Sequence, residues 1–201
     1  MDDKALFKLT SGLFLFITKT DKDNGCIINT VLQVTSSPVR IITVVNKNNY
    51  THDMVKKTGI FNVSVLSETA PMDLYKKFGY ASGRDTDKFT GYGSVRRSEN
   101  GILYLTEYSS AYISGKVIEE KDLGTHTLFI ADVTDAQIIS DSESVTYNYY
   151  QKNIKPAPET NNVNRKGFIC TICGYIYEES TLPEDYICPI CKHGAEAFKP
   201  L

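Results

Sequence analysis

The segment from residue 167 to residue 201 carries two Cys-x-x-Cys motifs, Cys170-Thr171-Ile172-Cys173 and Cys188-Pro189-Ile190-Cys191, with fourteen residues between them. Two such motifs bring four thiolates to the corners of a tetrahedron, a geometry that suits one zinc or iron ion. Two structural disulfides would be typical of an exported mini-protein, and a thioredoxin-like dithiol needs only one motif at a strand-to-helix junction. We therefore predict one metal site with four ligands: Cys170, Cys173, Cys188 and Cys191.

The sequence around the ligands bears on which metal is bound. Thiolates bind both zinc and iron, and the divalent affinity series favours zinc. The first motif continues as Gly174-Tyr175-Ile176-Tyr177, and Leu182-Pro183-Glu184-Asp185-Tyr186-Ile187 precedes the second, with Phe198 further on. This segment resembles a rubredoxin, with Tyr186 standing where a Trp is usual. The resemblance implies one iron on four thiolates, a one-electron carrier, and a zinc ribbon is the alternative.

Composition excludes several classes of protein. The 201 residues are 41% hydrophobic and 23% charged, which suits one ordinary core with a small appendage. The net charge of -2 argues against nucleic-acid binding. The part of the chain from residue 166 onward is itself acidic, with three lysines and five carboxylates. The apolar run at residues 13–17 is too short to cross a membrane, and no export signal is visible. We expect a cytoplasmic protein that contacts neither nucleic acid nor membrane, with Cys26 as a lone thiol.

The part of the chain before the metal motifs is dominated by short β-type segments. Residues 13–18 predict a buried strand, and Asn24-Gly25 predicts a tight turn into a returning strand. Thr51 is predicted to cap a helix over residues 52–58, which ends at Gly59. Many strands and few short helices favour a β-barrel. The other segments expected are strands at 41–45, 60–67, 111–118 and 127–133, and a helix at 70–78.

Two polar stretches are candidates for ligand binding. Residues 29–38 are rich in hydroxyl and amide side chains, and residues 46–51 lead into the predicted helix N-terminus. Such groups line sites for polar planar ligands or phosphates. The alternatives are a half-exposed strand with a Ser-Ser-Pro turn, and an ordinary capped surface helix. The charged, glycine-rich segment 79–92 is predicted to be either a lid or an exposed connection.

Together with residues 123–133, these stretches resemble the flavin reductase family over roughly residues 5 to 145. Residues 29–38 match its Asn-Ser-x-x-Ser-Val-Ser-x-x-Pro pattern. Residues 123–133 match a Gly-Asp-His-Thr-x-Phe-Ile-Gly-Glu-Val strand, with Thr125, Ala131 and Asp132 at variant places. The resemblance implies a mainly β fold class: an FMN-binding split β-barrel with a few short helices, followed by a small rubredoxin-like metal-knuckle domain.

The same resemblance implies a set of flavin-binding residues. Those expected to flank the isoalloxazine ring and ribityl chain are Asn29, Thr30, Gln33, Val34 and Thr35. Lys47, Tyr50 and Thr51 are expected near the phosphate. His126 is expected beside the flavin face where a nicotinamide docks, which makes it the candidate catalytic residue. A purely structural histidine is the alternative.

The domain order resembles that of the high-molecular-weight rubredoxins of anaerobes: a flavin reductase-like domain at 1–154, a linker at 155–166 and a rubredoxin-like domain at 167–201. This implies an oxidoreductase that passes electrons from NADH or NADPH, directly or through a reductase, via FMN and iron to a flavodiiron protein that reduces oxygen or nitric oxide. It also implies a homodimer. Two other functions stay open: a zinc-holding docking module on the barrel, and a flavin reductase that releases free reduced FMN.

Overall fold

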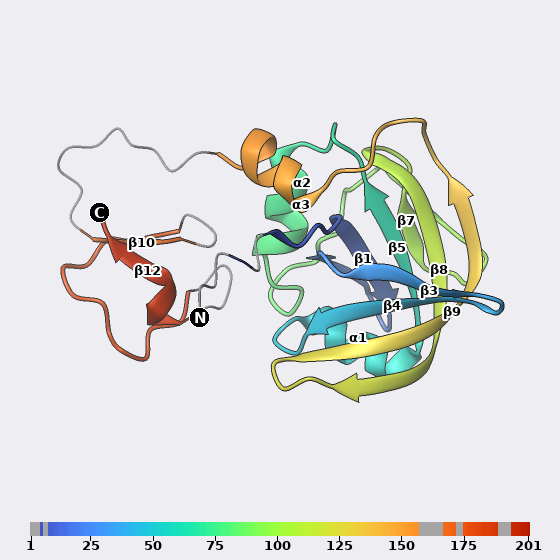
Figure 1. Ribbon diagram of the computed structural model, residues 1–201, viewed down its shortest axis with the longest axis horizontal. Helices are drawn as coiled ribbons and strands as arrows, with labels where there is room; N and C mark the ends of the chain where they lie inside the picture. The colour runs from blue at the N-terminus through green and yellow to red at the C-terminus, as the bar shows by residue number, and fades with distance from the viewer. Residues whose placement is uncertain (1–4, 6–7, 157–166, 172–174, 189–193) are drawn as a thin grey trace. The chain divides into compact units, whose positions relative to one another are not determined.

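A computed structural model describes residues 5, 8–156, 167–171, 175–188 and 194–201 of the chain (Figure 1). Internal contacts divide the chain into two compact units, Met1–Lys155 and Pro156–Leu201. The predicted linker lies almost entirely outside the described residues. Among the helices that the structure describes, none has the length and apolar character needed to cross a membrane.

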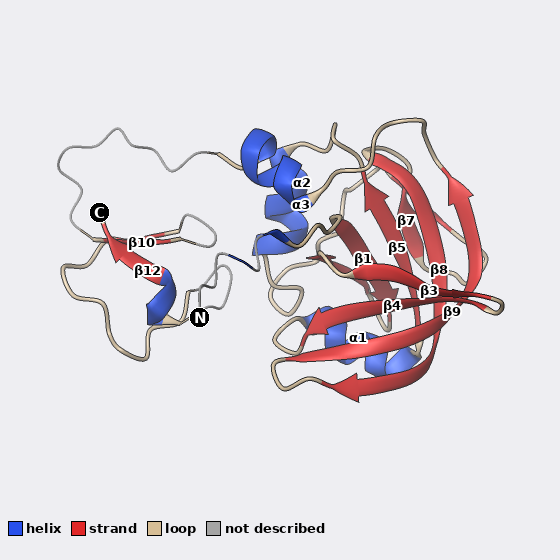
Figure 2. Ribbon diagram, viewed as in Figure 1, coloured by secondary structure: helices blue, strands red, loops and turns tan. Residues whose placement is uncertain are grey.

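The first unit is built on an antiparallel sheet of seven strands in the order β2-β1-β5-β8-β9-β4-β3 (Figure 2). Its edge strands β2 and β3 are consecutive in the chain and are joined by only Asn29 and Thr30, so the sheet curls until its edges approach each other. This confirms the predicted split β-barrel. The strands are β1 Phe14–Lys19, β2 Asp23–Ile28, β3 Val31–Ser36, β4 Val39–Asn46, β5 Ile60–Leu66, β8 Ser109–Asp122 and β9 His126–Ile138, with a separate hairpin of β6 Val95–Arg97 and β7 Leu103–Leu105.

Strand β1 is buried on both of its faces. Leu15 and Ile17 belong to a core cluster that includes Phe78 and Leu105, and Phe16 belongs to a second cluster that includes Phe61. Successive side chains of a strand point to opposite faces, so the unbroken apolar run of β1 serves both cores. The barrel therefore has a core inside the sheet and another beneath the helices that follow β5.

The predicted turn at Asn24-Gly25 is wrong, because both residues lie inside strand β2. They pair with Thr18 and Ile17 of β1, and the reversal takes place at Thr20–Lys22, where the Thr20 N–H donates to the Lys22 carbonyl at 3.1 Å. Gly25 is needed for close packing, since a Cβ there would lie 3.1 Å from the Leu15 side chain. Packing within the barrel, which short-range turn statistics ignore, accounts for the glycine.

Helix α1, Tyr50–Thr58, ends at Gly59 as predicted, with φ of 69° and its N–H donating to the Val55 carbonyl at 2.8 Å. Its N-cap is Asn49 and not Thr51. Thr51 is buried, and its hydroxyl accepts a 2.8 Å hydrogen bond from the Asn24 amide of β2. The remaining helices of this unit are α2 Met72–Tyr75, which continues into the π-helical turn η2 Lys76–Tyr80, and α3 Tyr147–Tyr149, which continues into η3 Tyr150–Ile154.

Buried tyrosines make the first unit sensitive to alkali. Burial raises the pKa of Tyr75, Tyr112 and Tyr150 above its usual value near 10. The unfolded chain then loses these phenolic protons first as the pH rises above about 10. We expect the free energy of unfolding to fall there by up to about 1.4 kcal/mol per pH unit for each tyrosine. Urea unfolding between pH 8 and 11 measures this slope, and Tyr75→Phe should flatten it; an equal slope in that variant would contradict the assignment.

The second unit is a small sheet in the order β11-β10-β12, built from β10 Phe168–Cys170, β11 Ile176–Tyr177 and β12 Phe198–Pro200. A single turn of 3-10 helix, η4 Ala195–Ala197, precedes β12. Among the described residues of this unit, Cys170, Cys188, Ala197 and Phe198 are buried. A unit as short as Pro156–Leu201 can build only a small core, and a metal ion commonly adds the missing stability in domains of this size.

Candidate functional site

A cavity of about 450 Å³ opens on the first unit where the β2–β3 connection, the end of β4 and the start of β9 come together. The N-cap of α1 and the first residue of α3 complete its wall. This volume lies within the range of small-molecule sites. The cavity is lined by Leu13, Ile27, Ile28, Asn29, Thr30, Val44, Asn46, Asn49, Leu123, His126 and Tyr147.

The cavity wall combines apolar side chains with polar ones. Three carboxamides, from Asn29, Asn46 and Asn49, line it with Thr30 and His126, and none of the described lining residues is an Asp, Glu, Lys or Arg. Amides offer both donors and acceptors, so they pair with a ring that presents both along its edge. The isoalloxazine of a flavin is such a ring, flat and apolar on its faces. The residues present therefore fit a flavin ring, whereas its phosphate needs groups outside this wall.

The structure brings together three of the predicted flavin residues, Asn29, Thr30 and His126. Gln33, Val34 and Thr35 lie instead on the exposed strand β3 and do not line the cavity. Gln33 donates to the Thr35 carbonyl at 3.2 Å, and the Thr35 hydroxyl donates to the carbonyl of Pro38. Their flavin contacts stay a prediction.

The residues predicted near the phosphate surround the start of α1 and likewise stay a prediction. Lys47 is paired with Asp122, with 2.6 Å between Nζ and Oδ1. The ring of Tyr50 has the Lys22 ammonium 5.4 Å and the Arg84 guanidinium 5.1 Å from its centroid. Thr51 is buried beneath them.

Arg84 also joins the segment 79–92 to helix α1. Its guanidinium lies 2.7 Å from the carboxylate of Asp53. Partial burial by itself raises the pKa of Asp53, but the hydrogen bonds from Arg84 and His52 outweigh it and hold the pKa below its usual value. Asp53 therefore stays ionised at neutral pH and keeps the cation in place.

Segment 79–92 is anchored to β2 by the buried side chain of Lys88. Its ammonium donates to the carbonyls of Gly25 and Phe78, both at 2.9 Å, and burial lowers its pKa. The segment is thus held at this point rather than merely exposed. Cys26, next to Gly25, is also buried, and burial raises the pKa of its thiol. Cys26 is therefore a protonated core residue.

Of the polar lining residues, sequence reasoning did not name three as site residues: Asn46, Asn49 and Tyr147. The two asparagines stand inside the polar stretch 46–51, so their amides were a usable signal. Tyr147 lies beyond residue 145, where the resemblance ends. It reaches the cavity because the start of α3 lies against the segment that precedes β1: the Tyr147 N–H donates to the Ser11 carbonyl at 2.7 Å. No local pattern in the sequence predicts such a contact.

In the second unit, the first metal motif begins at the end of strand β10. Cys170 ends β10, and its N–H donates to the Tyr175 carbonyl at 2.8 Å, one residue before β11 begins. The side chains of Cys170 and Cys188 are both 0% exposed. Cys173 and Cys191 lie outside the described residues. Two buried sulfurs on separate segments, in a unit with four cysteines, fit a single iron or zinc ion.

Tyr186 fills the aromatic position next to the second motif. Its ring lies 4.4 Å from that of Tyr177 and 5.4 Å from that of Phe198, and its hydroxyl donates to the Tyr175 hydroxyl at 3.5 Å. Burial raises the pKa of Tyr186, so the phenol stays neutral. The neutral ring packs over the buried cysteines, as the resemblance to rubredoxins implies for this position.

Comparison with protein families agrees with this division of the chain. Residues 6–158 match the flavin reductase like domain. Residues 168–199 match the rubredoxin-like domain of the rubrerythrin type. The first match covers more than half of the chain. The two matches indicate a flavin site in the first unit and an iron or other metal site in the second.

Relatives are found for the whole chain and for the first unit. A high molecular weight rubredoxin of Moorella thermoacetica is 37% identical over 100% of both chains. A ferric-chelate reductase (NAD(P)H) of Archaeoglobus fulgidus is 38% identical over 75% of this chain and 89% of its own. Both resemblances are strong enough to indicate an oxidoreductase.

Solved structures support the fold of the first unit. An FMN-binding protein from Thermus thermophilus superposes with a TM-score of 0.59 at 20% identity, over 65% of this chain and 73% of its own. An NADH:FAD oxidoreductase from Streptomyces globisporus superposes with a TM-score of 0.61 at 19% identity, over 72% and 89%. At these identities the likeness shows the fold alone. With the 37% identity over its whole length, the chain belongs to the family of high-molecular-weight rubredoxins, in which a flavin reductase-like domain is joined to a rubredoxin-like electron-transfer domain.

Proposed function

We propose that the chain passes electrons from NADH or NADPH through FMN in the cavity of the first unit to one iron ion held by the four cysteines of the second. The final acceptor is a redox partner such as a flavodiiron protein that reduces oxygen or nitric oxide. The observation that carries this proposal is a cavity lined by three carboxamides and apolar side chains, in the same chain as two buried cysteines of the predicted metal site. When bound, a flavin exchanges two electrons with a nicotinamide and one at a time with iron.

The cavity residues serve this function by binding and orienting the ring. The apolar side chains of Leu13, Ile28 and Val44 exclude water from its faces, and the amide of Asn29 pairs with its polar edge. His126 is held by Thr125, with 2.8 Å between Nδ1 and the hydroxyl oxygen, so its ring has a defined orientation at the cavity wall. We assign His126 to the place where the nicotinamide docks.

Replacing His126 by Asn is expected to slow flavin reduction by NADH about tenfold. This factor corresponds to the loss of one hydrogen bond of about 1.4 kcal/mol in the transition state. Flavin affinity should change less, because the other polar residues of the wall remain. Anaerobic stopped-flow absorbance measures the rate, and fluorescence titration measures the affinity. Thr125→Val, which keeps the histidine and removes its hydrogen-bond partner, should give an intermediate rate. An unchanged rate in the His126 variant would make this histidine structural.

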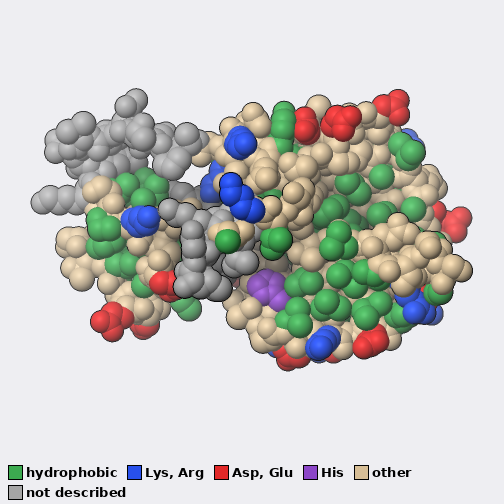
Figure 3. Space-filling model, in the orientation of Figure 1, with side chains coloured by type: hydrophobic (Ala, Val, Ile, Leu, Met, Phe, Trp, Pro, Cys, Tyr) green, Lys and Arg blue, Asp and Glu red, His purple; other side chains and the backbone are tan. Residues whose placement is uncertain are grey.

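The outer face of the sheet exposes apolar side chains next to the cavity. Leu32 of β3 is 60% exposed and Val34 is 47% exposed. Leu32 of β3 pairs with Ile42 of β4, and Ile42 pairs with Ile130 of β9, so the three form a row across the strands. Figure 3 shows hydrophobic side chains gathered over these strands. Val44 lies two residues along β4 from Ile42, on the same face of the sheet, and lines the cavity. Exposed apolar surface of this kind marks an interaction site, and its continuity with the cavity supports a second copy of the chain as the occupant.

Leu32→Arg is expected to convert a dimer to a monomer, because an unpaired charge buried in an apolar interface costs about 3–5 kcal/mol. Flavin affinity should fall with it, since the partner covers the cavity mouth. Light scattering during gel filtration and flavin titration measure the two effects. Ile138→Arg is the matched control, because Ile138 is also exposed but pairs with Ala111 of β8, outside the row formed by Leu32, Ile42 and Ile130. Persistence of the dimer in the Leu32 variant would remove this face from the interface.

The experiment that tests the proposed function is an anaerobic visible spectrum with metal analysis, before and after NADH or NADPH. Bleaching of both the flavin and the ferric-thiolate bands supports the relay and direct donation. Both bands present and unchanged would point to a separate reductase as donor. Zinc that persists when iron is supplied during expression would favour the docking-module interpretation.

A second candidate is a reductase that needs only the first unit. The observation in its favour is the 38% identity of this part of the chain to the ferric-chelate reductase of Archaeoglobus fulgidus. In that case, truncation after Lys155, where the first compact unit ends, leaves turnover of NADH with a ferric chelate or free flavin unchanged. Turnover that depends on the second unit would exclude it.

A further inference from the structure

A string of tyrosine rings runs from the flavin cavity into the helices behind it. Tyr147 lines the cavity, and its ring centroid lies 6.3 Å from that of Tyr150. The hydroxyl of Tyr150 lies 3.1 Å from the hydroxyl of Tyr80. Tyr75 packs on the side of this string, with 4.6 Å between its ring centroid and that of Tyr150. The three rings from Tyr147 to Tyr80 thus form a continuous path.

The path has one end in the cavity and one at the surface. Tyr150 is only 7% exposed, while Tyr147 and Tyr80 are each half-buried. Tyr80 and Tyr150 both belong to π-helical turns, η2 and η3, a conformation that is uncommon and is frequent at functional sites. The carbonyl of Tyr150 also accepts a 2.8 Å hydrogen bond from the N–H of Lys155, the last residue of the first unit.

We propose that Tyr147, Tyr150 and Tyr80 are the route by which single electrons leave the flavin cavity for the surface of the first unit. The inference rests on the proposed function and names the path by which the electrons leave the first unit. The rate of electron tunnelling falls steeply with the empty distance between groups. Here the rings of Tyr147 and Tyr150 are in contact, and a hydrogen bond joins Tyr150 to Tyr80, so little empty distance remains. Each passage would move one electron from a reduced flavin in the cavity to the ferric site, and the phenols would be left unchanged. Two passages would oxidise a fully reduced flavin completely, with its N–H protons released to water at the cavity mouth.

Variants of Tyr150 test the route in the full chain loaded with flavin and iron. Tyr150 lies outside the cavity wall, so flavin reduction by NADH should keep its wild-type rate. Tyr150→Phe keeps the ring and loses the hydrogen bonds of the hydroxyl, to Tyr80 and to the Met72 sulfur, and it should slow bleaching of the ferric band. Tyr150→Leu also loses the ring and should slow it further, severalfold. The matched control is Tyr75→Leu, which removes a buried ring of the same cluster that lies off the path, and it should transfer electrons at the wild-type rate.

A readout independent of turnover tests the cavity end of the route. A phenol in contact with an excited flavin gives it one electron and takes it back, which quenches the flavin emission. Tyr147→Phe keeps the ring and removes this easily oxidised group, so the fluorescence lifetime of bound flavin should lengthen. Tyr75→Phe, whose ring lies behind Tyr150, should leave the lifetime unchanged.

The outcomes separate the route from the proposed function. Wild-type ferric bleaching in Tyr150→Leu, or equal slowing in Tyr75→Leu, would overturn the route while the relay stands. An unchanged lifetime in Tyr147→Phe would also overturn it. If the iron of the wild-type chain stays ferric after its flavin is reduced, the relay itself fails, and the lifetime measurement still decides whether Tyr147 is coupled to the flavin.

Discussion

Replacing Cys188 by Ser is expected to abolish iron binding and leave flavin bound in the first unit. A serine hydroxyl is a harder and far weaker ligand than a thiolate. Four-ligand thiolate sites bind structural zinc with about 10–16 kcal/mol, so the loss of one ligand of four costs on the order of 3 kcal/mol, more than a hundredfold in affinity. Metal analysis and the visible spectrum measure the loss. Cys188 is 0% exposed, so its oxygen replacement also finds no water to compensate.

The control for this variant is the same change at Cys26. That thiol is buried in the barrel core of the first unit and belongs to neither metal motif, so Cys26→Ser should keep a full complement of iron. Cys173→Ser tests the first motif in the same way as Cys188→Ser tests the second. A ferric-thiolate spectrum that survives either change would show that the replaced cysteine is not a ligand.

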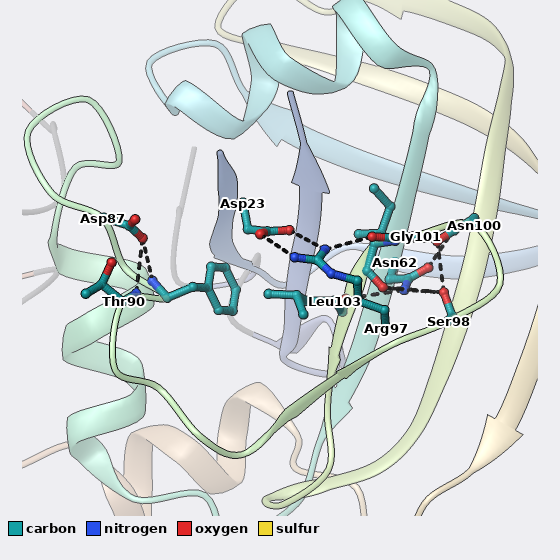
Figure 4. Close-up of polar contacts among 11 residues, drawn as sticks. Asp23, Asn62, Asp87, Thr90, Arg97, Ser98, Asn100, Gly101 and Leu103 are labelled. Carbon is teal, nitrogen blue, oxygen red and sulfur yellow. Dashed lines mark hydrogen bonds and ion pairs between the residues drawn. The ribbon is translucent and has the colours of Figure 1, made fainter. Parts of the chain in front are cut away.

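Replacing Asn62 by Ala is expected to be the most damaging single change in the first unit. Asn62 is 0% exposed on β5 (Figure 4). Its amide nitrogen donates to the Ser98 hydroxyl at 2.8 Å and to the Ile102 carbonyl at 2.9 Å. Its amide oxygen accepts from Asn100 at 2.9 Å and from the Ser114 hydroxyl at 2.7 Å. One side chain therefore joins β5 to β8 and to the β6–β7 hairpin.

The alanine variant leaves several buried polar groups without a partner, each at a cost of about 1–3 kcal/mol. We expect a loss of about 3–5 kcal/mol, a large part of the 5–15 kcal/mol that holds a typical domain together. Urea unfolding followed by fluorescence measures it. Asn153→Ala is the control, because the Asn153 side chain is exposed and donates only to the Tyr149 carbonyl. A loss below about 1 kcal/mol for Asn62 would mean that water replaces the missing amide.

The hairpin that Asn62 holds is fastened at a second point to strand β2. The Arg97 guanidinium makes two hydrogen bonds of 2.8 Å to the carboxylate of Asp23 and a third of 2.8 Å to the Gly101 carbonyl (Figure 4). A two-pronged Arg–carboxylate pair has fixed geometry. The β6–β7 hairpin is thus held to β2 and β5 by polar contacts between segments distant in sequence.

Local patterns in the sequence were sufficient for the fold class, and they predict the four metal ligands. A Cys-x-x-Cys motif is a short-range feature, and its spacing alone limits the chemistry. The apolar run of β1 and the alternation in β9 likewise reflect a strand's own geometry, so the barrel was predictable. The helix end at Gly59 followed from the left-handed conformation that glycine tolerates.

Tertiary structure alone decided which residues share the cavity. Tyr147 joins Asn29 there although more than a hundred residues separate them, and Gln33 and Thr35, a few positions from Asn29, face solvent instead. Lys47, expected near a phosphate, is paired with Asp122. The sequence by itself determined the kinds of group available, because those depend on side-chain chemistry and short spacing. Which of these groups meet was set by the curl of the sheet and the packing of helices on it, because both depend on contacts between segments distant in the sequence.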